Sequence, residues 1–337
     1  MKKQLAVMFV LILGLFLVAC GNEGGTTSTS DGEQASIGMV TDLGSVNDKS
    51  FNQSAWEGLQ KLKEDHGYDV KYLEPQSDAE VEPSLLQFVN NKTDLTWATA
   101  ATLEDAVKNI AETNPDAKLG IVDSALEGVA NVVSVSFKEN EGAFLAGVVA
   151  GTMTESDKVG FVGGMEIPVI QRFHAGFAAG VKAVNPDAEV LVNYVGAFNR
   201  VDMGKSAAAT MYDAGVDIIF HASGGTGNGI FNEAQERFNA GKQVWVIGVD
   251  KDQSLEFGND ITLTSMMKYV DQAVYDISHE ALTGQFPGGE VVRLGLNENG
   301  VGLADTSDIN VSQEVLSKVE EYKEEIINGN IEVPETP

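Results

Sequence analysis

The chain has 337 residues, enough for two domains, and its 43% hydrophobic and 21% charged residues are typical of a soluble globular protein. A formal net charge of -28 argues against a nucleic-acid-binding protein, because contacts with phosphates need clustered lysine and arginine. The 36 glycines against 8 prolines indicate many tight turns and not a disordered chain.

The N-terminal residues have the features of an export signal. Two lysines precede the apolar run from Leu5 to Ala19, which is too short to favour a membrane span. Cys20 follows and is the only cysteine, so no disulfide can form within the chain. Its position resembles a bacterial lipobox, in which the sulfur is lipidated; a plain signal peptide with an incidental cysteine is the alternative. We expect a signal peptide at 1–19, then at 20–35 a lipidated Cys20 and a flexible tether rich in glycine, serine and threonine.

From residue 36 onward, short runs rich in valine and isoleucine alternate with stretches of helical spacing. This alternation predicts parallel βαβ units and therefore an α/β fold. We expect strands at 36–41, 70–75, 95–100, 119–124, 132–137, 159–164, 190–196, 216–223, 244–250 and 261–267. We expect helices at 52–65, 81–91, 103–114, 170–184, 204–214 and 229–240, a small-residue helix within 137–153 and an amphipathic helix near the C-terminus. An Asn-Pro-Asp-Ala turn occurs at 114–117 and again at 185–188, which indicates two similar lobes or simply a common helix stop.

Aspartates stand at the ends of three expected strands. Asp42 follows the first strand, Asp123 comes at the end of the fourth, and Asp250 comes at the end of the run at 244–250. Ligands of open parallel sheets bind beyond the carboxyl ends of the strands, where these carboxylates would accept hydrogen bonds from ligand hydroxyls. Each aspartate alone would also suit a helix cap or a turn. The three together favour a ligand site.

Two phenylalanines lie on loops next to strand ends. Phe51 precedes a helix, and Phe198 follows the seventh expected strand. A loop aromatic commonly covers the core, but a pair from two lobes would also suit a flat ring between them. Trp97 lies inside a strand, and the sequence leaves open whether it faces the core or a cleft. The glycine-rich stretch 222–231, which contains Gly225, matches no dinucleotide fingerprint and indicates close approach of a ligand to the backbone or a plain turn.

Enzyme signatures are missing from the sequence. The four histidines have no metal-ligand spacing, and neither H-E-x-x-H nor G-x-S-x-G occurs. No acid–base constellation stands out either. We therefore expect a binding protein that is not an enzyme and has no cofactor and no metal.

Five motifs, in chain order, resemble one protein family. They are DLGSVNDKSFNQSAWEGL, GFVGGMEIPVIQRFHAGFAAG, GGTGNGIFNEA, VIGVDKDQ and TSMMKYVDQAVYD. Together they resemble the basic membrane protein (BMP) family of bacterial lipoproteins, which are substrate-binding proteins of ABC transporters; the best understood members are purine nucleoside receptors. The resemblance implies a periplasmic-binding-protein type I fold, with two Rossmann-like lobes whose parallel sheets are joined by three crossover strands. We expect lobe 1 at 36–138 plus 264–286 and lobe 2 at 139–263 plus 287–337.

The resemblance also implies a ligand site, transferred motif by motif. Phe51 and Phe198 would sandwich the base, and Asp250 and Lys268 would hold the ribose hydroxyls. Lys268 rests on the resemblance alone. The other transferred ligand-binding residues are Asp42, Asn52, Asp123 and Gly225. The two aspartates among them would face the base or the sugar.

The implied function is binding without turnover. Ligand would enter an open cleft, the lobes would close, and the closed form would dock on a permease. The expected partners are a nucleoside, the permease and the membrane through the lipid anchor, with no nucleic acid; the expected state is a monomer, lipid-anchored outside the cytoplasmic membrane. Three alternatives stay open: a different small ligand such as a sugar, a ligand-sensing lipoprotein without a permease, and a nucleoside hydrolase or phosphorylase.

Overall fold

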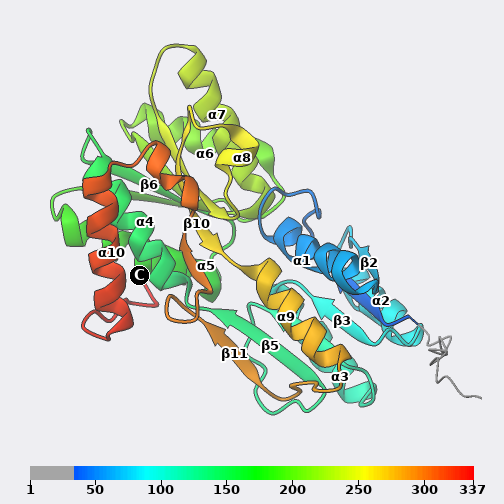
Figure 1. Cartoon of the computed structure of the whole chain (residues 1–337). Coiled ribbons are helices and arrows are strands. Elements are labelled where there is room, and N and C mark those ends of the chain that lie inside the picture. The colour runs from blue at the N-terminus through cyan, green and yellow to red at the C-terminus, as the bar shows by residue number, and fades with distance from the viewer. Residues whose placement is uncertain (1–33) are drawn as a thin grey trace, which may run out of the picture. The chain divides into compact units, whose positions relative to one another are not determined.

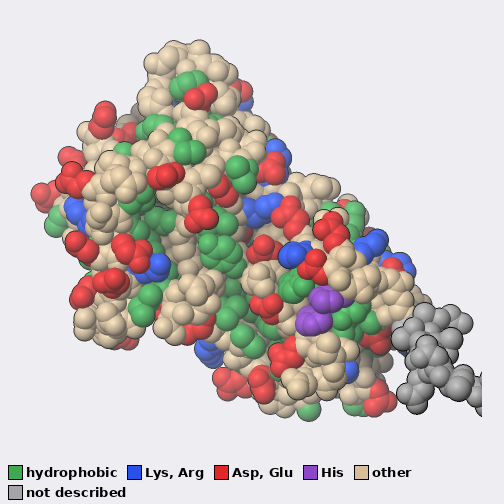
Figure 2. Space-filling model, viewed as in Figure 1, with side chains coloured by type: hydrophobic (Ala, Val, Ile, Leu, Met, Phe, Trp, Pro, Cys, Tyr) green, Lys and Arg blue, Asp and Glu red, His purple; other side chains and the backbone are tan. Residues whose placement is uncertain are grey.

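The computed structural model of the chain describes residues 34–337. The expected signal peptide, Cys20 and most of the tether lie outside this range. Within it, none of the helices combines the length and the apolarity that crossing a bilayer requires. Acidic side chains are spread over the face of the molecule seen in Figure 2, in keeping with the net charge of -28.

Two six-stranded sheets organise the described residues (Figure 1). The first has the strand order β11-β5-β4-β3-β1-β2 and the second the order β12-β10-β9-β8-β6-β7. Neighbouring strands pair in parallel, except β10 with β12. The first sheet contains β1 (Ser36–Val40), β2 (Asp69–Leu73), β3 (Leu95–Ala98), β4 (Leu119–Val122), β5 (Val132–Phe137) and β11 (Val291–Leu294). The second contains β6 (Lys158–Gly163), β7 (Glu189–Tyr194), β8 (Ile218–Ala222), β9 (Trp245–Asp250), β10 (Thr262–Lys268) and β12 (Val301–Leu303).

Buried apolar runs account for the central strands. β3, β4 and β5 are buried along their whole length, because helices cover both faces of a parallel sheet. All ten strands that the sequence predicts are present, close to the expected bounds. The sequence does not predict β11 and β12. Both are short, partly exposed strands at sheet edges, so their apolar signal is weak.

Helices flank both sheets (Figure 1). The helices of the first sheet are α1 (Phe51–His66), α2 (Asp78–Asn90), α3 (Glu104–Thr113) and α9 (Val270–Leu282). The helices of the second are α4 (Glu139–Met153), α5 (Pro168–Val184), α6 (Val201–Asp213), α7 (Gly227–Asn239), the short α8 (Ser254–Phe257) and α10 (Gln313–Ile327), which packs on α4. The predicted helices are all confirmed, and α9 and the short α8 are additions to them. Each sheet with its helices forms one lobe, called here lobe 1 for the first sheet and lobe 2 for the second.

Glycines allow α4 and α5 to pack very closely. A Cβ atom added at Gly180 of α5 would lie 2.0 Å from the carbonyl oxygen of Phe144, and one at Gly147 of α4 would lie 2.2 Å from the carbonyl oxygen of Phe177. Only a residue without a side chain permits this approach. The close contact fixes α5, which forms one wall of the cleft described below.

The chain passes between the lobes three times: from β5 to α4, from β10 to α9, and from β11 to β12. The three crossovers match the predicted architecture. Two expected boundaries differ from the strand pairing, however. The segment from residue 264 was expected in lobe 1, but β10 pairs with β9 in the second sheet; the segment from 287 was expected in lobe 2, but β11 pairs with β5 in the first. An apolar run does not specify which sheet edge it joins, so the sequence could not distinguish these placements.

Candidate ligand-binding site

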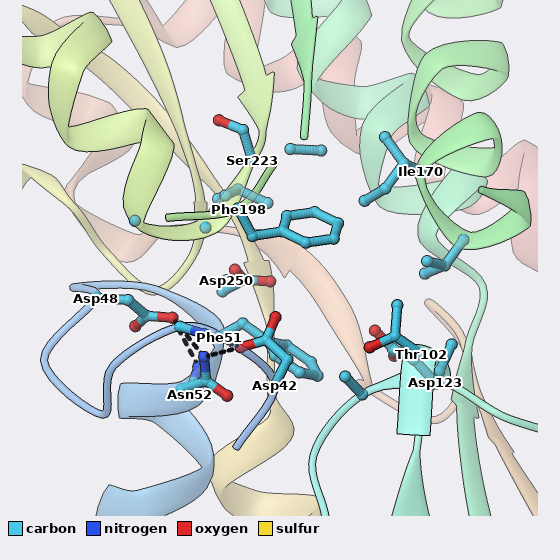
Figure 3. A pocket seen from close by; sticks show the side chains of 18 of the residues that line it. Asp42, Asp48, Phe51, Asn52, Thr102, Asp123, Ile170, Phe198, Ser223 and Asp250 are labelled. Atoms are coloured by element: carbon cyan, nitrogen blue, oxygen red, sulfur yellow. Dashed lines mark hydrogen bonds between the residues drawn. The ribbon is translucent and has the colours of Figure 1, made fainter. Parts of the chain in front are cut away.

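A cavity of about 590 Å³ lies between the lobes, at the carboxyl ends of the strands (Figure 3). This volume counts all the empty space of the cavity, including the part that is open to solvent. All eight ligand-binding residues expected from the sequence line this cavity: Asp42, Phe51, Asn52, Asp123, Phe198, Gly225, Asp250 and Lys268. The structure therefore brings the whole predicted set together from both lobes. Whether each one contacts ligand stays a prediction.

The three strand-end aspartates hold the positions that the topology predicts. Asp42 and Asp123 follow β1 and β4 in lobe 1, and Asp250 is the last residue of β9 in lobe 2. Asp123 has a φ of 65° and Asp250 a φ of 66°, in the left-handed region that aspartate tolerates better than most residues. The chain thus turns sharply where each carboxylate enters the cavity.

Asp48 caps the start of α1. Its two carboxylate oxygens accept the backbone N–H groups of Ser50 (2.8 Å), Asn52 (3.0 Å) and Gln53 (3.1 Å). These are donors that a helix N-terminus leaves without partners. Asp48 therefore satisfies three backbone donors at the start of the helix. The side chain also lines the cavity, which the sequence did not indicate.

Asn52 links this cap to the first strand. Its side-chain amide donates to Asp42 (2.8 Å) and to Asp48 (3.2 Å), and its oxygen accepts the hydroxyl of Thr99 (3.0 Å). In Figure 3 these bonds hold the three carboxyl and amide groups together on the lobe 1 side of the cavity. Asn52 is therefore held mainly by protein partners.

The two phenylalanines come from opposite lobes. Phe51 is the first residue of α1, and Phe198 lies in the loop between β7 and α6. In Figure 3 their rings lie on opposite sides of the space, with Asp250 beside them. Phe198 rests on the backbone at Gly164, where an added Cβ would lie 2.3 Å from its ring. Trp97 does not reach the cavity: it is fully buried and its Nε1–H donates to Ser278 Oγ at 2.8 Å, so it belongs to the core.

Lys268 ends β10 with its ammonium buried between the lobes. Its Nζ donates to Asp123 Oδ1 at 2.6 Å and lies 3.1 Å from Glu139 Oε1. Burial acts to lower the pKa of Lys268, but the charges of the neighbouring carboxylates outweigh burial and raise the pKa above its ordinary value. The side chain therefore presents a permanent positive charge to the cavity.

Burial raises the pKa of each of the four acidic side chains that line the cavity. The pKa rises to about 7 for Asp48 and to about 6 for Asp123, and it is also raised for Asp42 and Asp250. Hydrogen bonds and the Lys268 charge oppose this effect without cancelling it. Ligand groups that donate hydrogen bonds would stabilise the ionised carboxylates, so the site suits a ligand with several hydroxyl or amide donors.

The glycine-rich stretch forms a short 3-10 turn, Gly224–Thr226, that leads into α7. Gly225 lines the cavity beside the backbone of Phe198. Gly227 faces the ring of buried His221, where an added Cβ would lie 2.2 Å from the ring. Both readings of this stretch therefore have a basis in the structure: one glycine lies at the cavity, and another is required for packing.

Sequence reasoning missed the wall that α5 contributes. Ile170 and Phe173 of α5 line the cavity, and their apolar spacing on a helix is indistinguishable from that of core residues. It also missed Glu139, which lies 3.1 Å from the Lys268 Nζ behind the cavity wall, and Arg172, which donates a hydrogen bond to Glu139. Within residues 34–337, no cluster of histidine, cysteine, aspartate or glutamate has the geometry of a metal site.

Comparison with known proteins agrees with this geometry. The model of the Bmp family, described as "ABC transporter substrate-binding protein PnrA-like", matches residues 35–337. The chain is 45% identical to a CD4+ T-cell-stimulating antigen of Listeria monocytogenes over 100% of both chains. It is 36% identical to the ABC transporter nucleoside-binding protein BmpA of Lactococcus lactis over 99% of both chains.

Among solved structures, an ABC transporter solute-binding protein from Aeropyrum pernix superposes with a TM-score of 0.84. The two share 30% sequence identity, and the match covers 90% of this chain and 94% of that one. Both the sheet topology and this superposition correspond to the type I periplasmic-binding-protein fold. The chain therefore belongs to the Bmp family of PnrA-like ABC transporter substrate-binding proteins.

Proposed function

We propose that this substrate-binding protein takes up a purine nucleoside in the cavity between its lobes. The observation that carries the proposal is the pair Phe51 and Phe198, which come from different lobes and lie on opposite sides of one cavity. A planar base between two rings gains stacking energy on both faces. The name of the Lactococcus lactis relative, a nucleoside-binding protein, supports the same ligand class.

The polar groups of the cavity suit the rest of a nucleoside. Lys268 and Asp250 lie together on the lobe 2 side and offer a donor and an acceptor to neighbouring ribose hydroxyls. Asp42, Asn52 and Asp123 lie on the lobe 1 side and would contact the edge of the base or the remaining sugar oxygens. Gly225 would let the ligand approach the backbone. A sugar alone would satisfy the polar groups but would leave the two rings only partly covered.

The protein would act by binding and delivery. We propose that the signal peptide at 1–19 is removed, that Cys20 carries a lipid at the outer surface of the cell membrane, and that the monomeric body passes its ligand to a permease. The closed state would be stabilised by contacts between the lobes. Among these, Lys251 of lobe 2 lies 2.6 Å from Glu57 of lobe 1, and Gln253 donates to the backbone carbonyl of Lys49 at 2.9 Å.

Calorimetry with protein freed of ligand by unfolding and refolding tests the proposal. Guanosine, inosine and adenosine should bind at least about tenfold more tightly than uridine, and ribose alone should bind most weakly because it lacks the stacked ring. Tighter binding of ribose or of another sugar than of the nucleosides would show that the ligand is a sugar and that the nucleoside proposal is wrong. Release of free base during the titration would identify a hydrolase or phosphorylase in place of a binding protein.

A further inference from the structure

A network of four charges lies at the inner end of the cleft, and the proposed ligand contacts account for only half of it. It consists of Lys268, Asp123, Glu139 and Arg172. The Lys268 Nζ lies between the two carboxylates, 2.6 Å from Asp123 and 3.1 Å from Glu139. Glu139 is held from its other side, because Arg172 Nε donates to its Oε2 at 2.6 Å. Each of these two carboxylates is thus paired with a positive charge, which offsets part of the cost of burying it.

Glu139 touches the cavity lining without lining the cavity. Lys268 and Asp123 are exposed to the cavity, whereas Glu139 is fully buried and is not part of its wall. Burying a carboxylate costs free energy of folding unless fixed partners offset its charge. The presence of Glu139 behind a lysine of the ligand site therefore needs an explanation. Contact with ligand cannot be that explanation. Its contacts with Lys268 and Arg172 remain, and of these two only Lys268 lines the cavity.

The network also joins two crossovers to lobe 1. Glu139 is the first residue of α4, directly after the first crossover, and Lys268 is the last residue of β10, directly before the second. Asp123 follows β4 of lobe 1. The position of the Lys268 ammonium therefore depends on how the lobes and their crossovers are arranged, and Glu139 provides the fixed point from lobe 2.

The protein contacts of the Lys268 ammonium do not use all three of its N–H donors. An ammonium carries three N–H donors on a flexible stem. One donates to Asp123, the charge of Glu139 draws the group from a second side, and the rings of Phe51, Phe137 and Phe173 lie 5.0, 5.0 and 5.6 Å from Nζ. At least one N–H stays available to an acceptor in the cavity.

Glu139 also keeps a countercharge in place when ligand binds. Asp123 lines the cavity, so a ligand donor can compete with Lys268 for its oxygens. Glu139 is out of reach of ligand and its interaction with Lys268 is not shared. Without it, an ammonium that is buried between the lobes would depend on Asp123 and Asp250, two carboxylates that the ligand would also use.

We propose that Glu139, anchored by Arg172, is a positioning residue that aims the Lys268 ammonium at a hydroxyl oxygen of the ligand. The inference rests on the proposed function in one respect, namely that the ligand carries a 2′- or 3′-hydroxyl on its ribose. It adds a residue that touches neither ligand nor cavity and yet determines how well the hydroxyl is bound.

The test compares adenosine with 2′,3′-dideoxyadenosine, which lacks the 2′- and 3′-hydroxyls of the ribose, by calorimetry. Glu139→Gln keeps the shape of the side chain and removes its charge. It should weaken adenosine by about tenfold or more, the loss expected for a misplaced hydrogen bond from a charged donor, and should change binding of the dideoxy compound little. Equal losses for both compounds, or no loss for adenosine, would overturn the inference.

Glu233→Gln is the matched control. Glu233 is also buried and lies 2.8 Å from an arginine, Arg237, but it belongs to α7 and does not line the cavity. This variant should bind both compounds as the unmodified protein does. Glu139→Asp, which keeps the charge on a shorter stem, should recover part of the lost adenosine affinity. Glu139→Asp serves as the test if Glu139→Gln fails to fold. Its shorter stem should weaken adenosine relative to the unmodified protein, and an adenosine affinity equal to that of the unmodified protein would count against the inference.

A measurement without ligand separates this inference from the proposed function. The ammonium signal of Lys268, seen by NMR in protein with nitrogen-15 lysine and assigned with Lys268→Met, should exchange its hydrogens at least about tenfold faster in Glu139→Gln, because the group is held less firmly. Glu233→Gln should leave that rate unchanged. If the rate rises but adenosine fails to bind the unmodified protein, the nucleoside proposal fails and the positioning of Lys268 by Glu139 stands. An unchanged rate in Glu139→Gln would overturn the inference.

Discussion

Replacing Phe51 by alanine removes one face of the proposed base sandwich. Phe51 is half-buried, borders both the cavity and the core, and its ring lies 5.0 Å from the Lys268 ammonium. The substitution therefore removes the ring on which the base would stack and also one of the groups that hold the ammonium in place.

The expected size of the effect follows from these two contacts. Loss of one base–aromatic stack weakens binding by about 1–3 kcal/mol. Because Phe51 also contacts the ammonium, we expect a loss in the upper half of that range, which corresponds to an increase in Kd of about 30- to 150-fold. Phe198 comes from the opposite lobe, and Phe198→Ala should lie in the lower half of the range.

Calorimetry with guanosine measures both losses, and Phe51→Leu is the decisive control. Leucine keeps most of the apolar volume that packs on the core and lacks the flat ring, so it should lose nearly as much affinity as alanine while destabilising the fold less. Urea unfolding of the same variants measures stability separately. If Phe51→Leu binds guanosine as the unmodified protein does, the ring does not stack on the base and the sandwich is wrong.

The remaining predictions concern stability. Gly180→Ala should lower the free energy of unfolding by about 1–3 kcal/mol in urea, because the added Cβ meets the carbonyl of Phe144, whereas Gly302→Ala, with nothing within 4 Å of its added Cβ, should change it little; equal effects would contradict the close packing of α4 and α5. Burial raises the pKa of Asp48 from 3.8 to about 7, so its contribution to stability is complete below pH 3.8 and is lost as the pH rises through about 7. The free energy of unfolding of the ligand-free protein should therefore fall between about pH 4 and about pH 7, and it should fall less in Asp48→Asn; a rise over this window would contradict the assignment.

The central strands were predictable because strands that are buried on both faces consist of uninterrupted apolar runs. β5 is buried at all six positions, and such a run can hardly be anything but the middle of a covered parallel sheet. The same rule located Asp42, Asp123 and Asp250, because carboxyl ends of parallel strands meet at one edge. The positions of these three aspartates could be predicted without knowing the order of the strands in the sheet.

The edge strands were not predictable in this way. β11 pairs with β5 just before the chain crosses to lobe 2, and its residues are only partly buried. Nothing in a short, half-exposed run specifies the sheet that it joins, since that choice depends on where the two lobes lie. The expected lobe boundaries within 264–337 differ from the strand pairing for this reason.

The charged inner end of the cleft shows the same limit for the site. Lys268 at the end of a strand has the appearance of an ordinary surface lysine, and Glu139 that of an acidic residue in the first turn of a helix. Their burial results from contacts between segments more than a hundred residues apart, which no local pattern carries. The family resemblance supplied Lys268; only the structure shows Glu139 and Arg172 behind it.

The identity of the small molecule in the cleft tests the central claim most directly. Protein purified from cells without refolding would be denatured, and the released molecules identified by liquid chromatography with mass spectrometry. We predict a purine nucleoside, present in the unmodified protein and reduced in Phe51→Ala. Release of a sugar, or of any other ligand without a purine ring, would contradict the claim.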